Sequence, residues 1–113
     1  KVTKVYYPGI EGTKAYEICK KQASGFGSML TFEVESKELA LHILKSTKLI
    51  PFAESLGGVE TLLTYPTTQT HADVPEEVRL RNGITDRVLR LSVGIEDKAD
   101  LIADLKQAID SYR

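Results

Sequence analysis

A serine beside two glycines is the first feature of this sequence that packing alone does not explain. The segment Ala53-Glu54-Ser55-Leu56-Gly57-Gly58-Val59-Glu60 ends an apolar run with two polar residues and then places the glycine pair. Paired glycines let a backbone bend sharply or approach a ligand closely, and a serine hydroxyl beside them can donate a hydrogen bond to an anion. A tight turn between two strands explains the same residues, and turn chemistry alone favours that interpretation.

An arginine inside a strand-like segment is the second feature. Residues 86–93 alternate in character, with one face made of Leu89, Leu91 and Val93 and the other of Val88, Arg90 and Ser92. Arg90 is therefore predicted to point away from the apolar trio. Because an unpaired buried charge is costly, its guanidinium needs a carboxylate, which it can bind through two parallel hydrogen bonds. That carboxylate belongs either to a substrate or to an internal Asp or Glu, and internal pairing is the commoner outcome.

The other reactive residues lack the neighbours that their chemistry requires. His42 and His71 have no cysteine or carboxylate at metal-ligand spacing, so no metal site is expected. The run Gly25-Phe26-Gly27-Ser28 precedes a strand instead of linking a strand to a helix, which indicates a turn and not a phosphate-binding loop. Lys48, in Ser46-Thr47-Lys48, fits the polar end of a helix better than a nucleophile or a Schiff-base lysine.

Hydrophobic periodicity predicts the elements that must position these residues. Strands are expected before Pro8-Gly9, over the alternation of Leu30, Phe32 and Val34, and at residues 49–53, 61–65 and 86–93. Helices are expected after the caps Thr13 and Ser36, from Pro75 to Gly83, and after Asp97, where one stripe contains Leu101, Ile102, Leu105, Ala108, Ile109 and Tyr112. This order predicts an α+β fold, a small sandwich with a mainly antiparallel sheet covered by helices.

The length of the chain fits one domain, and its near-neutral charge argues against polyanionic partners. The 113 residues carry 15 Lys+Arg against 16 Asp+Glu, a net charge of −1, so neither nucleic acid nor an anionic membrane is expected to bind. The single Cys19 cannot form an internal disulfide, which fits a reducing, cytoplasmic location. The chain enters a strand-like run already at Val2, and we therefore expect it to be part of a longer polypeptide.

Three blocks, in order, carry a family resemblance that begins at Tyr6-Tyr7-Pro8-Gly9. They are Phe52-Ala53-Glu54-Ser55-Leu56-Gly57-Gly58-Val59-Glu60, Thr70-His71-Ala72 and Arg87-Val88-Leu89-Arg90-Leu91-Ser92-Val93-Gly94-Ile95-Glu96-Asp97. With them the chain resembles the Cys/Met-metabolism pyridoxal-phosphate-dependent enzymes, such as cystathionine γ-synthase, γ-lyase and β-lyase, methionine γ-lyase and related sulfhydrylases. The resemblance covers essentially the whole chain but only the carboxy-terminal part of such an enzyme. It implies the fold of the C-terminal domain of fold-type I pyridoxal-phosphate-dependent transferases.

The resemblance assigns roles to four residues. Arg90 would bind the α-carboxylate of an amino-acid substrate, Ser55 would assist, and Thr70 would lie near the same carboxylate. Glu54 matches a glutamate that accompanies chemistry at the γ-position, near the distal amino or leaving group. This favours a γ-synthase or γ-lyase over a β-lyase, and it favours substrate binding over internal pairing for Arg90.

The resemblance also implies what residues 1–113 lack. The family's Schiff-base lysine stands in a Ser-x-Thr-Lys context followed by Gly-His, whereas Lys48 is followed by Leu49-Ile50-Pro51-Phe52. We therefore expect a substrate-carboxylate domain that is inactive alone, with pyridoxal phosphate bound by an absent large domain in a homotetrameric parent. The expected substrate is a homoserine ester or cystathionine. The alternatives are a cystathionine β-lyase, or a non-catalytic interaction module that retains the fold.

Overall fold

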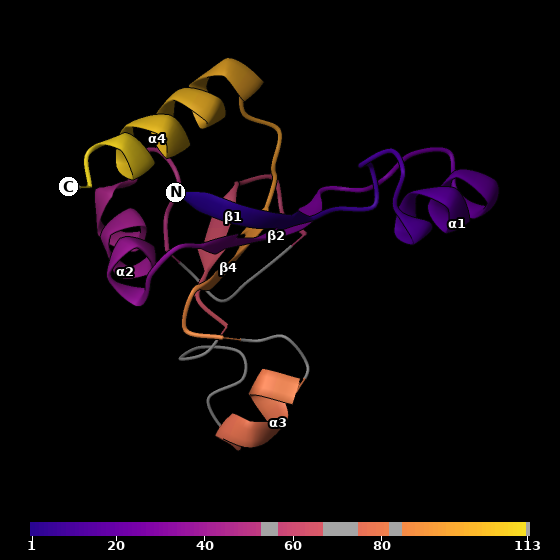
Figure 1. Cartoon of the computed structure of the whole chain (residues 1–113). Helices are drawn as coiled ribbons and strands as arrows, with labels where there is room; N and C mark the ends of the chain where they lie inside the picture. Colours follow the sequence, from indigo (N-terminus) through magenta and orange to yellow (C-terminus); the bar gives the residue numbers. More distant parts are fainter. Residues whose placement is uncertain (53–56, 67–74, 82–84, 113) are drawn as a thin grey trace.

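The sheet at the centre of the molecule has the strand order β1-β2-β4-β3 (Figure 1). The computed structural model describes residues 1–52, 57–66, 75–81 and 85–112. Its strands are β1 (Val2–Tyr6), β2 (Met29–Val34), β3 (Leu62–Thr64) and β4 (Val88–Ser92). Neighbouring strands pair antiparallel throughout this order, which confirms the predicted sheet.

Side-chain caps begin three of the helices at the predicted residues. The helices are α1 (Lys14–Gln22), α2 (Lys37–Ser46), α3 (Glu76–Arg81) and α4 (Lys98–Asp110). The Thr13 hydroxyl accepts the Tyr16 N–H at 3.1 Å, and the Ser36 hydroxyl accepts the Leu39 N–H at 3.1 Å. The Asp97 carboxylate accepts the N–H of Ala99 at 2.8 Å. Each cap satisfies a backbone donor that the first helical turn leaves open.

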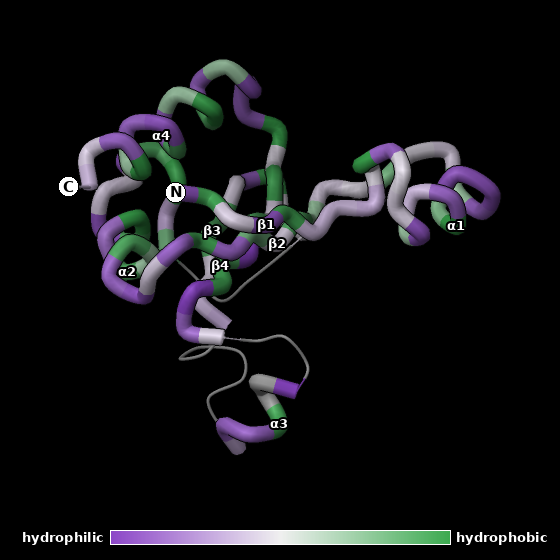
Figure 2. The backbone as a smooth tube through the Cα atoms, viewed as in Figure 1, coloured by the Kyte–Doolittle hydropathy of each residue, from purple (hydrophilic) through white to green (hydrophobic). Residues whose placement is uncertain are grey.

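One hydrophobic core forms between the sheet and helices α2 and α4, which lie side by side (Figures 1 and 2). Its buried members come from all these elements: Phe32, Val34, Leu39, Ala40, Ile43, Ile50, Leu63, Tyr65, Leu89, Leu91, Leu101 and Ala108. Helix α1 lies apart from this core and has no buried residue (Figure 1). The α+β prediction is therefore confirmed, with the helical cover formed by α2 and α4.

The strand predicted at residues 49–53 is wrong for the part that the structure describes. Residues 48–50 bend, and only Phe52 pairs with Leu63, in an isolated parallel bridge. The cause is Asp104 of α4, whose carboxylate accepts three consecutive backbone N–H groups, those of residues 48, 49 and 50, at 2.8, 2.8 and 2.9 Å. Donors that converge on one carboxylate curl the chain around it and cannot form a strand ladder.

The stripe predicted for the last helix is wrong at one position. Ile102 is 62% exposed, while Asp104 is only 7% exposed. Helical geometry explains why Asp104 is buried and Ile102 is exposed, because positions 101, 104 and 108 lie on one face and position 102 is rotated by about 100° from 101. The buried face of α4 therefore contains an acid between Leu101 and Ala108.

Candidate functional site

Arg90 lies half-buried on β4, a strand with neighbours on both sides. In the register its partners are Thr31 of β2 and Thr64 of β3. Leu89 and Leu91, its neighbours in sequence, belong to the core beneath α2 and α4. Because successive strand side chains point to opposite faces, Arg90 is on the face away from that core. The predicted direction of Arg90 is confirmed, and its cross-strand neighbours are hydroxyl side chains.

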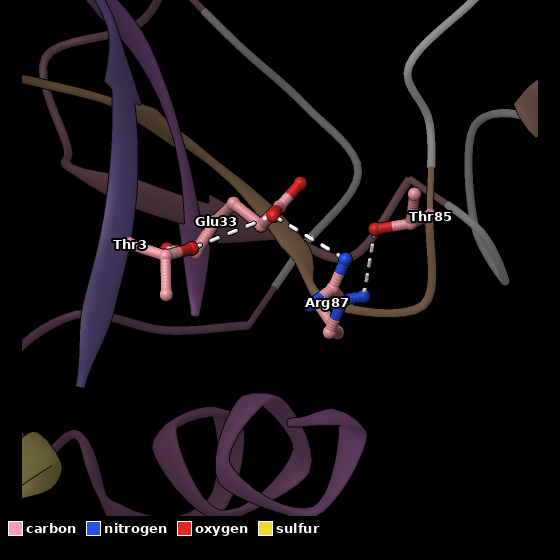
Figure 3. Close-up of polar contacts among 4 residues, drawn as sticks. All are labelled: Thr3, Glu33, Thr85 and Arg87. Carbon is pink, nitrogen blue, oxygen red and sulfur yellow. Dashed lines mark hydrogen bonds and ion pairs between the residues drawn. The ribbon is translucent and has the colours of Figure 1, made fainter. Parts of the chain in front are cut away.

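Glu33 of β2 lies on the same face of the sheet as Arg90, but its side chain contacts Arg87 and Thr3. Its Oε1 lies 3.4 Å from Nη2 of Arg87 and 3.4 Å from the hydroxyl of Thr3 (Figure 3). The backbone N–H of Arg87 in turn donates to the hydroxyl of Thr85 at 3.2 Å (Figure 3). The ion pair of Glu33 with Arg87 thus lies directly before β4, three residues before Arg90 in the sequence.

The glycine pair approaches the strand that carries Arg90. The backbone N–H of Gly57 donates to the hydroxyl of Ser92 at 2.9 Å, and Gly57 has φ +77°, a conformation that favours glycine. Ser92 is buried and lies two positions after Arg90 on β4, so both side chains share one face, with backbones roughly 7 Å apart. At Gly57 the chain therefore bends and contacts β4 through the side chain of Ser92.

A second attachment joins the same segment to the loop after β4. Thr61 donates to Glu96 twice, from its backbone N–H to Oε2 at 2.8 Å and from its hydroxyl to Oε1 at 2.6 Å. The Thr61 hydroxyl also accepts the N–H of Gly94 at 2.8 Å, and the N–H of Ile95 donates to the carbonyl of Val59 at 2.9 Å. We call the bidentate contact of Thr61 with Glu96 the Thr61–Glu96 clamp.

The clamp requires Glu96 in its ionised form, and the backbone contact beside it requires a glycine at position 94. The hydroxyl and the backbone N–H of Thr61, both donating to the carboxylate, hold the pKa of Glu96 below its ordinary value. A Cβ on Gly94 would lie 2.2 Å from the Val59 carbonyl oxygen, so the two loops touch backbone to backbone. Sequence reasoning missed Glu96, because nothing near it in the sequence reveals a partner 35 positions away.

Three of the four residues predicted to contact substrate lie outside the described residues. These are Glu54, Ser55 and Thr70, and His71 is outside as well. The structure therefore places Arg90 and the segment that follows Ser55, but does not test whether the four side chains meet.

Lys48 and Arg90 lie on opposite sides of the sheet. The backbone N–H of Lys48 donates to Asp104 of α4, in the helical layer, whereas Arg90 lies on the face away from that layer. The backbone of Lys48 is thus held on the side of the sheet opposite to Arg90.

The remaining polar candidates have structural partners. His42 Nε2 lies 2.8 Å from the hydroxyl of Ser111 and 3.1 Å from that of Ser46. The Cys19 thiol lies 3.4 Å from the carbonyl of Gly25. Within the described ranges, no group of three or more His, Cys, Asp or Glu side chains is arranged to hold a metal ion. None of the helices in those ranges has the length and apolarity that a bilayer crossing demands.

Comparisons with known proteins agree with this geometry. Among the curated relatives, a cystathionine γ-lyase from Dictyostelium discoideum is 50% identical over 97% of this chain. A cystathionine β-lyase from Lactococcus lactis subsp. cremoris is 44% identical over 96% of it. A solved cystathionine γ-synthase from Xanthomonas oryzae pv. oryzae, in complex with cystathionine, superimposes with a TM-score of 0.91 at 39% identity over 96% of the chain. The relatives are thus divided among γ-lyase, β-lyase and γ-synthase.

The chain is much shorter than these proteins, covering 29% of each of the two lyases and 28% of the γ-synthase. A family model described as "Cys/Met metabolism PLP-dependent enzyme" matches residues 1–110. The chain therefore belongs to the Cys/Met metabolism family of pyridoxal-phosphate-dependent enzymes.

Proposed function

We propose that residues 1–113 form the substrate-carboxylate domain of a pyridoxal-phosphate-dependent trans-sulfuration enzyme. Its substrate is a sulfur amino acid or a precursor, cystathionine or a homoserine ester, and its chemistry is γ-replacement or γ-elimination. Arg90 binds the α-carboxylate, Ser55 and Thr70 assist, and Glu54 lies near the distal amino or leaving group.

The position of Arg90 is the observation that carries this proposal. Arg90 lies half-buried on an interior strand, on the face away from the hydrophobic core and between two threonines, and a guanidinium can bind a carboxylate through two parallel hydrogen bonds. Gly57, two positions after Ser55, is attached to Ser92 on the same strand face, which supports a role for Ser55 beside Arg90.

A guanidinium that holds a carboxylate through two hydrogen bonds fixes its orientation as well as its position. For an amino acid, this fixes the bonds at Cα relative to the rest of the active site, an orientation effect that speeds reaction. Pyridoxal phosphate, when bound, supplies the electron sink of the reaction. We assign the cofactor and its lysine to a large domain outside residues 1–113, so that the present chain is inactive alone. The proposal includes a homotetrameric parent in the cytoplasm, where a lone Cys19 stays reduced.

The test compares Arg90→Lys and Arg90→Ala in the full-length parent enzyme. Lysine keeps the positive charge but loses the two-pronged geometry, and alanine loses both. Because removal of one partner of a buried charge pair costs about 2–5 kcal/mol, we expect kcat/KM to fall at least about 30-fold in Arg90→Ala. Unchanged kinetics in both variants, with an amino-acid substrate, contradict the proposal.

A β-lyase is the second candidate, because the Lactococcus lactis β-lyase is 44% identical over almost the whole chain. The two candidates differ in the bond that breaks, so their products differ. Purified full-length enzyme incubated with cystathionine releases 2-oxobutanoate by γ-elimination and pyruvate by β-elimination. Pyruvate as the main product contradicts the γ-assignment and leaves the role of Arg90 intact.

A further inference from the structure

We propose that Glu96 is a positioning residue for the substrate-carboxylate site. It acts through Thr61 on the backbone of residues 57–61, which contacts β4, the strand that carries Arg90. This inference rests on the proposed function, because it assumes that Arg90 binds a substrate carboxylate. Glu96 itself contacts no substrate in this scheme.

The clamp joins two loops through both oxygens of one carboxylate. Both carboxylate oxygens of Glu96 are used, one by the backbone N–H of Thr61 and one by its hydroxyl. The same hydroxyl accepts the N–H of Gly94, and Thr61 is fully buried with both its N–H and its hydroxyl hydrogen-bonded. Hydrogen bonds to an ionised acceptor are about twice as strong as neutral ones, so this contact resists opening.

Residues 57–61 are attached at both ends to β4 and the loop that follows it. At one end Gly57 donates to Ser92, and at the other Thr61 is held by Glu96 and Gly94. Ser92 shares strand and face with Arg90. A backbone fixed at one point to this strand and at another to the loop directly after it keeps its place relative to the other side chains of the strand. Loss of either attachment therefore changes the surroundings of a carboxylate bound to Arg90, without removing Arg90.

The experiment uses the full-length parent enzyme and makes the same substitution, threonine to valine, at a test site and at a control site. Thr61→Val keeps the shape of the side chain but removes the hydroxyl from the clamp. Thr47→Val is the control, because the Thr47 hydroxyl donates to the Ile50 carbonyl at 2.8 Å on the helical side of the sheet. Thr61→Ser keeps a hydroxyl at position 61 and serves as the rescue variant. Ser92→Ala removes the other attachment, that of Gly57 to β4, and this variant tests the inference if Thr61→Val does not fold.

The readout is carboxylate selectivity, the ratio of inhibition constants for L-alaninamide and L-alanine. A merely structural change weakens both inhibitors alike and leaves the ratio unchanged. We expect the ratio to fall about three- to tenfold in Thr61→Val and in Ser92→Ala, the effect of one lost hydrogen bond. We also expect KM for the amino-acid substrate to change more than kcat. Thr61→Ser should return the ratio to within twofold of the wild-type value, and Thr47→Val should not alter it.

Arg90→Lys separates the two ideas. If Arg90→Lys leaves the ratio unchanged, the proposed function is wrong. If Arg90→Lys abolishes the selectivity but Thr61→Val and Ser92→Ala keep the wild-type ratio, the positioning role of Glu96 is wrong and the proposed function stands.

Discussion

Asp104→Asn is the substitution for which the structure gives the most definite expectation. The wild-type carboxylate is buried and accepts the backbone N–H groups of Lys48, Leu49 and Ile50 together with the side-chain amide of Gln107. Asparagine keeps one oxygen and replaces the other with an NH₂ group. If that oxygen faces residues 49 and 50, the N–H of Lys48 and the side-chain amide of Gln107 are both left against another donor, but the Gln107 amide keeps its hydrogen bond to the Ser46 carbonyl.

The magnitude follows from these contacts. One unsatisfied donor costs about 1–3 kcal/mol, and the loss of charge weakens the two remaining hydrogen bonds by roughly 1 kcal/mol in total. We therefore expect the free energy of unfolding of the chain, measured with urea at pH 7, to fall by about 2–4 kcal/mol. Asp110→Asn makes the same chemical change at an exposed position of the same helix and should stay within about 0.5 kcal/mol of wild type.

The pH dependence gives a second check with a defined sign. Burial raises the pKa of Asp104, but the donors of residues 48–50 and Gln107 together outweigh it and lower the pKa from its ordinary value of 3.8. The stabilisation is therefore complete above the unfolded value and is lost as pH falls through the lower folded value. The gap between wild type and Asp104→Asn should be constant from about pH 7 to pH 5 and shrink below about pH 3.8. Equal stability of Asp104→Asn and Asp110→Asn at pH 7, or a gap that does not shrink in acid, refutes the reasoning.

Two further predictions use the same urea assay. Gly94→Ala should lower the free energy of unfolding by about 1–3 kcal/mol, because the added Cβ would lie 2.2 Å from the Val59 carbonyl oxygen. Gly25→Ala is the control, because position 25 has open space around it, and the free energy of unfolding should change little. Equal values for the two variants contradict the backbone contact. Leu101→Ala should cost about 2–4 kcal/mol and the exposed Ile102→Ala less than about 1 kcal/mol; a larger loss at Ile102 would restore the stripe predicted from the sequence.

Local chemistry made much of the fold predictable. The caps Thr13 and Ser36 satisfy N–H groups three residues away, a distance that short motifs report directly. Alternation in β4 placed Arg90 on the face away from the core, because a two-residue period leaves a strand side chain only two directions. Predictions of this kind succeed where a residue's role depends on its immediate neighbours in the sequence.

The errors come from partners far away in the sequence. Residues 49–53 have the apolar character of a strand, yet an acid more than 50 positions later bends residues 48–50. Hydrophobicity alone assigns Ile102 to the stripe, whereas Asp104, three positions after Leu101 and four before Ala108, occupies the buried face. An acid at that spacing within an apolar stripe is itself a signal, because a buried carboxylate requires donors to satisfy it.

The two carboxylates missed by sequence reasoning flank the same stretch of chain. Asp104 fixes residues 48–50 on the helical side of the sheet, and Glu96 fixes Thr61 beside the end of β4. Between these points the chain passes the edge strand β3, where Phe52 bridges Leu63. The stretch that contains Glu54 and Ser55 therefore starts and ends at backbones held by acids from the last 20 residues of the chain. Under the proposed function, changes at Glu96 should alter substrate recognition although Glu96 itself contacts no substrate.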